Sequence, residues 1–127
     1  MKKEIYELEK LWAENKYLVL SRSQKNYKKI RELLKEKNNP NSTEIIKLIE
    51  DSKNLPKSVP NAINAAEHIW GYFKNLADEN EKESFQKLIA SFKKSEVSEK
   101  NIKQFLKRLL EKYPNSYLIK SNYFDID

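Results

Sequence analysis

PNAINAAEHIWGYFKNLA, the stretch from Pro60 to Ala77, decides the fold. Its apolar residues recur every three or four positions, as they do on one face of an α-helix. The stripe is widened by neighbouring alanine, isoleucine and leucine residues into a broad apolar arc. Its members are Ile63, Ala66, Trp70, Phe73 and Ala77, flanked by Ala62, Ala65, Ile69 and Leu76. The pattern predicts a central helix over 60–77 that is buried on this arc, with Trp70 in the core.

Amphipathic segments on both sides of this stretch predict further helices. The first runs over 3–20, and the second follows a Ser23 cap to residue 37. A shorter helix, capped by Ser42 or Thr43, follows Pro40. The fifth begins with a capping box formed by Asn80 and Glu83. The sixth is capped by Ser98, ends before Pro114, buries a stripe from Ile102 to Tyr113, and exposes Lys100, Lys103 and Lys107.

Composition supports an all-α fold. The 127 residues include one glycine and four prolines, too few breakers for the many turns of a β-sandwich or barrel. We predict one domain over 1–127, a bundle of about six helices. The apolar tail over 115–127 is expected to pack back on this bundle.

Several kinds of chemistry are excluded by composition. The chain has no cysteine, which removes disulfides, thiolate zinc sites and cysteine-ligated iron–sulfur clusters. We therefore expect no cofactor. Because residues 1–7 contain several charges and no segment approaches the ~20 apolar residues of a membrane span, we also expect a cytoplasmic protein without a membrane partner.

Positive charge is concentrated near the N-terminus. The net charge is +6, and residues 16–37 alone hold eight lysines and arginines against two glutamates. Such a field suits a polyanion, although a generally basic surface would give the same count. Tyr17 and Tyr27 interleave with the cations, and the turn at Ser23 is expected to offer free N–H groups to a phosphate. The alternative places both tyrosines in the core.

The single histidine lies on a polar face of the predicted central helix. A helical projection places His68 with Asn64, Tyr72 and Asn75 opposite the apolar arc. Such a face is suited to bases of looped RNA, with Tyr72 stacking and the other side chains hydrogen-bonding. The alternatives are a polar seam beneath a neighbouring helix and an acid–base role for His68. No metal-ligand spacing surrounds it, and no nucleophile elbow surrounds Ser21 or Ser23, the serines that a Ser–His–Asp triad would need.

Three motifs together resemble the YbgA family of bacterial domains. They are NKYLVLSRS from Asn15 with Tyr27 beyond it, Asn64 followed by EHIWGYFK from Glu67, and YPNSYL from Tyr113 with Tyr123 and Asp125. The resemblance covers about residues 11–127. Members occur alone or fused behind a thiouracil-desulfidase domain.

The resemblance implies an RNA-binding accessory module without catalytic activity of its own. Its expected ligand is thiolated transfer RNA, especially RNA containing 4-thiouridine, and its expected partner is a separate desulfidase. The alternatives are a metal-free nuclease or nucleotide hydrolase that uses His68, and a protein-interaction bundle. The predicted RNA-binding residues are Lys16, Tyr17, Arg22, Ser23, Lys25, Tyr27, Lys28, Arg31, Asn64, His68, Tyr72 and Lys74.

Overall fold

The chain folds entirely into helices, as the sequence predicts. The computed structural model describes residues 2–125, and in that range it contains seven α-helices, one 3-10 helix and no strand. In chain order the elements are α1 (Lys2–Arg22), α2 (Gln24–Leu33), α3 (Ser42–Lys53), α4 (Val59–Trp70), α5 (Glu79–Lys93), α6 (Glu99–Lys112), α7 (Ser116–Ile119) and η1 (Asn122–Phe124). The prediction of about six main helices and a tail is therefore confirmed.

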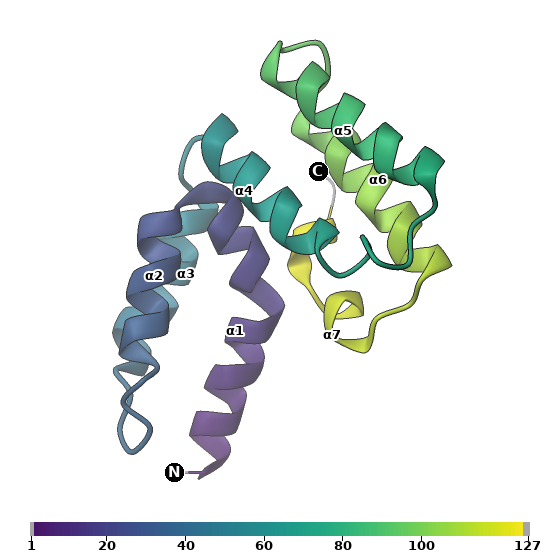
Figure 1. Ribbon diagram of the computed structural model, residues 1–127. Helices are drawn as coiled ribbons and strands as arrows, with labels where there is room; N and C mark the ends of the chain where they lie inside the picture. The colour runs from purple at the N-terminus through teal and green to yellow at the C-terminus, as the bar shows by residue number, and fades with distance from the viewer. Residues whose placement is uncertain (1, 126–127) are drawn as a thin grey trace.

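Helices α1 and α4 hold the bundle together. Helix α1 contacts α2, α3, α4 and η1, while α4 contacts both α1 and α6. Helices α5 and α6 pair as a hairpin on the other side of α4 from α2 and α3 (Figure 1). The predicted central helix thus bridges the two halves, and α1 contacts more elements than α4 does. No helix in the described part of the chain is both long and apolar enough to cross a membrane.

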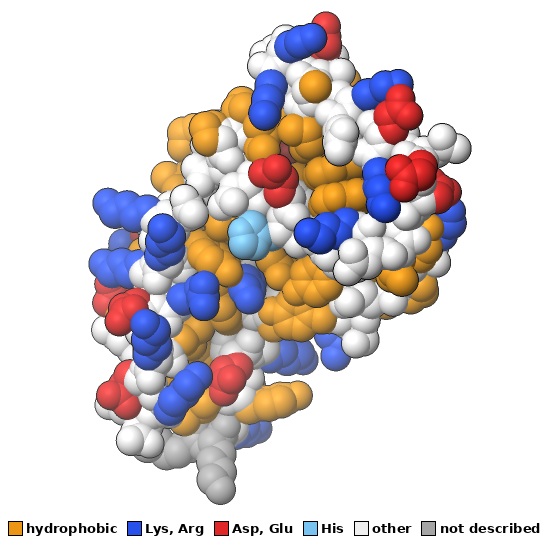
Figure 2. All heavy atoms as spheres, in the orientation of Figure 1, with side chains coloured by type: hydrophobic (Ala, Val, Ile, Leu, Met, Phe, Trp, Pro, Cys, Tyr) orange, Lys and Arg blue, Asp and Glu red, His pale blue; other side chains and the backbone are white. Residues whose placement is uncertain are grey.

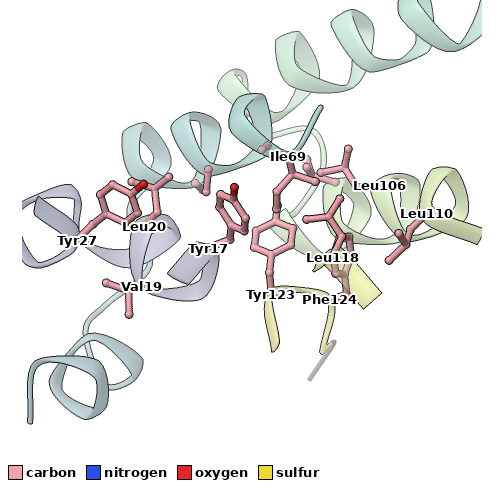
Figure 3. Packing of buried hydrophobic residues seen from close by; sticks show 14 of the residues in the cluster. Tyr17, Val19, Leu20, Tyr27, Ile69, Leu106, Leu110, Leu118, Tyr123 and Phe124 are labelled. Atoms are coloured by element: carbon pink, nitrogen blue, oxygen red, sulfur yellow. The ribbon is translucent and has the colours of Figure 1, made fainter. Parts of the chain in front are cut away.

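The tail completes the core, in agreement with the sequence-based expectation. Leu118, Tyr123 and Phe124 are buried beside side chains of α4 and α6 (Figure 3). The side-chain amide of Asn122 donates a hydrogen bond of 2.9 Å to Oδ1 of Asn15. Asn15 is a buried residue of α1. The tail therefore contributes both apolar packing and a polar anchor.

Local capping chemistry sets most helix starts. Ser23 caps α2 by accepting a hydrogen bond from the Asn26 N–H, as predicted. Ser98 precedes α6, where Asn101 Oδ1 accepts a hydrogen bond of 2.9 Å from the Ser98 N–H. The cap of α3 is Asn41, so the predicted cap at Ser42 or Thr43 is wrong by one or two residues.

The predicted capping box at Asn80 and Glu83 is wrong by two residues. Asp78 and Glu81 form the box, with hydrogen bonds of 2.8 and 2.9 Å between each side chain and the other residue's N–H. Further contacts of the Glu81 side chain explain why this pair, and not Asn80 with Glu83, forms the capping box. Tyr113 donates to its carboxylate at 2.7 Å, and the Lys112 ammonium lies 3.1 Å away. Tertiary contacts from α6 therefore select one of two possible caps.

Two predicted helices are too long. Helix α2 ends at Leu33 and is followed by a turn, so the predicted continuation to residue 37 is wrong. Helix α4 ends at Trp70, and 71–76 form turns in which Phe73 stays buried while Leu76 is exposed. Trp70 is partly buried at the edge of the core, where it stacks on Phe85 with a ring separation of 4.6 Å.

Lys103 does not lie on the solvent face of α6, contrary to prediction. It is only 7% exposed, and its ammonium lies 4.8 Å from the centre of the Tyr123 ring. The tail folds over this side of the helix, which a projection of α6 alone does not anticipate. Lys100 and Lys107 are exposed as predicted.

Candidate nucleic-acid interface

The His68 face of α4 is open to solvent. His68 is exposed, Asn64 is half-buried, and Tyr72 is 37% exposed on the turn that follows the helix. Figure 2 shows the imidazole near the centre of one face, with Lys and Arg side chains gathered over α2 and hydrophobic side chains beside it. The alternative of a buried polar seam is therefore wrong.

A hydrogen bond between two tyrosines joins this face to α1. The hydroxyls of Tyr17 and Tyr72 lie 2.7 Å apart, and their rings meet edge to face with centroids separated by 6.2 Å. Tyr17 is buried, and this burial together with the hydrogen bond raises the pKa of its hydroxyl well above the usual value. The Tyr17 phenol thus stays neutral at physiological pH, and its hydrogen bond holds Tyr72 in a defined position at the surface.

Tyr117 is a further aromatic residue of this surface that sequence reasoning missed. It is 38% exposed, and its ring lies edge to face with Tyr17 at a centroid separation of 6.5 Å. Asn115 caps α7 by accepting from the N–H groups of Tyr117 and Leu118. This cap turns Leu118 into the core and leaves Tyr117 outside, a division that the capping residue in YPNSYL could have indicated.

Two cations stand over the buried tyrosines. The Lys16 ammonium lies 5.6 Å from the Tyr17 ring centre, and the Arg31 guanidinium lies 5.7 Å from that of Tyr27. Partial burial and the nearby charge of Arg31 lower the pKa of Lys16. Neither cation forms an ion pair within residues 2–125. An anion between them would relieve their repulsion.

Tyr17 and Tyr27 are core residues, which corrects their predicted role. Each is less than a tenth exposed, and Tyr27 packs against Trp12 with a ring separation of 5.7 Å. Neither ring offers a face for stacking a base. Their contribution to the surface is to support Lys16, Arg31 and the exposed tyrosines.

The α2 N-terminus is not the open phosphate site that the sequence suggested. The Gln24 N–H donates to Asn61 Oδ1 at 2.9 Å, and the Asn26 N–H donates to Ser23 Oγ. Arg22 donates a hydrogen bond of 2.9 Å to the Leu55 carbonyl oxygen, and this joins the end of α1 to the loop before α4. Arg22 and Ser23 therefore hold the fold here and leave little free for a ligand.

The remaining predicted contacts are exposed lysines. Lys25 and Lys28 lie on α2 and Lys74 lies on the turn after α4. In the described part of the chain none of the three forms an ion pair, whereas neighbouring Lys29 binds Glu44 at 3.1 Å. They are available to polyanions.

A catalytic arrangement around His68 lacks an orienting partner among the described residues. No side chain there hydrogen-bonds to its imidazole, and no group of three histidine or acidic residues is placed to hold a metal ion. A general base normally needs such an orienting group. The geometry is better suited to hydrogen bonding with a ligand.

The fold and this surface define a small helical protein with a basic, aromatic face. The chain belongs to the DUF1722 family, described as a protein of unknown function, whose match spans residues 16–126. That range covers nearly the same residues as the YbgA resemblance. No curated protein and no solved structure matches the chain.

Proposed function

We propose that this protein is an RNA-binding accessory module for thiolated transfer RNA that acts with a separate desulfidase. The observation that carries the RNA-binding part is the exposed face on which His68 and Tyr72 lie beside a second aromatic ring, Tyr117, and the unpaired cations Lys16 and Arg31. The thiolated transfer RNA and the desulfidase rest on the YbgA resemblance.

Affinity and recognition come from different residues in this proposal. Lys16, Lys25, Lys28 and Arg31 contact phosphates, which supplies salt-dependent affinity for any RNA. Tyr72 and Tyr117 are partly exposed and offer rings for stacking, while Asn64 and His68 offer hydrogen bonds to base edges. Because unpaired bases expose both their faces and their edges, looped or single-stranded segments fit this surface better than duplex does.

Charge reversal on α2 tests the phosphate contacts. Four contacts predict a slope of log K against log salt concentration of about −3 to −3.6 for transfer RNA. Replacing Lys25→Glu together with Lys28→Glu should weaken binding by at least tenfold at ~0.15 M salt. The double substitution should also flatten the slope by about two contacts. Fluorescence anisotropy with labelled transfer RNA measures both quantities.

The matched control reverses two exposed lysines on another helix. Lys100→Glu with Lys107→Glu on α6 removes the same net charge, and neither lysine forms an ion pair among the described residues. This pair should have a much smaller effect on affinity. Equal losses from the two pairs would indicate a diffuse basic field, and no binding of transfer RNA by the unaltered protein would refute the proposal.

Neutral substitutions separate base recognition from charge. His68→Ala and Tyr72→Ala should weaken binding to a loop-containing RNA while leaving the salt slope unchanged, because neither change removes a lysine or an arginine. Binding to a fully paired duplex should change little. Conversion or cleavage of the RNA in proportion to the amount of purified protein would favour the nuclease alternative instead.

A further inference from the structure

A groove lies between α1 and the end of α2. Its volume is about 500 Å³, within the range of small-ligand sites. The apolar part is formed by Leu8 and Trp12 of α1 together with Leu34, the residue after α2. A second hollow of about 460 Å³ shares the lining residues Glu9, Ala13 and Tyr117 with it. The two hollows therefore border on the same three side chains.

Charged side chains of both signs line the groove. Arg31, Lys35 and Lys37 lie against Glu9 and Glu36. Lys35 is paired with Glu32 at 3.0 Å, and the Glu36 carboxylate accepts a hydrogen bond from the Asn38 N–H. Arg31, Lys37 and Glu9 form no ion pair within residues 2–125. The lining is therefore slightly basic, and Arg31 and Lys37 are its two cations without a carboxylate partner.

The groove also has one partly exposed aromatic ring. Tyr117 lines the groove and is 38% exposed, whereas Trp12, packed against Tyr27, is 9% exposed and forms only a small part of the floor. A ligand with a planar ring and a negative group matches this combination of an aromatic ring and unpaired cations. A nucleotide has both features.

The groove is continuous with the candidate RNA face. Tyr117 lines the groove and also contacts Tyr17. The Tyr17 hydroxyl is in turn hydrogen-bonded to that of Tyr72 on the RNA face. Arg31 is shared in the same way, since it lines the groove and belongs to the cation pair with Lys16. A phosphate bound at Arg31 would therefore lie at the groove as well as beside Lys16.

We propose that this groove takes up one unpaired nucleobase of the bound RNA, with Arg31 and Lys37 at its phosphate and Tyr117 at its ring. The inference rests on the proposed function and adds a base-binding site to it. Five of the twelve lining residues, all within 5–13 of α1, lie outside the range of the family match.

A substitution that fills the groove tests this site. Ala13→Leu places a larger side chain in the lining while keeping a good helix former in α1. The probe is a stem-loop RNA with a fluorescent adenine analogue at one loop position, scanned through the loop. We expect the unaltered protein to quench one position strongly, and Ala13→Leu to abolish that quenching and raise Kd between about fivefold and a hundredfold.

Two further variants keep the test decisive. Ala90→Leu makes the same change at an exposed position of α5 and should leave both quenching and Kd unchanged. Leu34→Phe fills the groove from its opposite wall and should act like Ala13→Leu, which guards against a folding defect in either variant. Quenching that survives both groove variants would overturn the inference.

A second readout distinguishes failure of the inference from failure of the proposed function. In a Trp70→Phe background Trp12 is the sole tryptophan. Titration with a nucleoside monophosphate should quench its fluorescence, and Ala13→Leu should abolish this quenching. RNA binding with the expected salt slope but no quenching of loop base or Trp12 would refute the groove alone. Nucleotide quenching without RNA binding would support the groove and refute the RNA module. If a fatty acid displaced the loop base from the groove and a nucleotide did not, the assignment of the groove to a nucleobase would be overturned.

Discussion

Replacing Tyr123→Ala is expected to destabilise the protein by about 3–5 kcal/mol, because truncation of a buried aromatic side chain removes apolar contacts and leaves a cavity. The Tyr123 ring is 0% exposed and meets Phe124 edge to face with a centroid separation of 5.3 Å. The Lys103 ammonium lies over its face. Since η1 contacts both α1 and α6, the cavity would lie between the two halves of the bundle.

The hydroxyl of Tyr123 makes the test more specific. Within residues 2–125 the buried oxygen has no hydrogen-bond partner. Burial and the neighbouring charge of Glu99 raise the pKa of this hydroxyl, so it stays neutral. Because a buried hydroxyl without a partner contributes little or is unfavourable, Tyr123→Phe should change the stability by less than about 1 kcal/mol. The packing of the ring, and not its polarity, then accounts for the large effect.

Urea unfolding followed by far-UV circular dichroism measures both variants. Ile119→Ala is the control in the same tail, since Ile119 is 61% exposed and its loss should cost no more than about 0.5 kcal/mol. An unchanged m-value would show that the tail unfolds together with the bundle. A Tyr123→Ala loss below about 1 kcal/mol, or an equal loss for Ile119→Ala, would refute the placement of the tail in the core.

Two further predictions concern hydrogen bonds that shape the surface and the α5–α6 hairpin. A double-mutant cycle of Tyr17→Phe and Tyr72→Phe should give a coupling energy of about 0.5–1 kcal/mol in urea unfolding, because the hydroxyls bond only to each other among the described residues; additive losses would contradict the bond. Glu81→Gln should lower Tm at neutral pH. Hydrogen bonds from the Asp78 N–H and Tyr113 lower the pKa of Glu81 in the folded state, so its stabilisation is present above the ordinary glutamate pKa of about 4.3 and is lost as pH falls through the lowered value. The Tm values of variant and parent should therefore converge in acid, and a pH-independent gap would contradict this reasoning.

The sequence predicts the helical class well because its signals there are local. Ser23 and Ser98 stand directly before apolar-periodic segments, and each precedes a helix start in the structure. The choice between Asp78 and Asn80 is not local, since each has a glutamate three residues later. The contacts of Glu81 with Lys112 and Tyr113, together with the ion pair between Asp78 and Lys112, favour the first.

The candidate surface was predictable in part, for a similar reason. Projection of one helix placed His68 correctly on an exposed face. It could not place Tyr17 and Tyr27, because the break at Ser23 separates them on two helices whose relative angle the sequence does not define. Lys103 was misassigned because the tail, distant in sequence, covers its side of α6. Tertiary packing decided each of these positions.

The hydrogen bond between Asn15 and Asn122 also has a consequence for synthesis of the chain. The two residues are 107 positions apart. At a translation rate of about 5–20 residues per second, roughly 5–20 seconds separate their additions to the growing chain. During that interval the polar side chain of Asn15 and the apolar surface beside it have no native cover from η1. Nascent helices of this protein therefore expose a partly apolar surface to chaperones until residues 122–124 leave the ribosome.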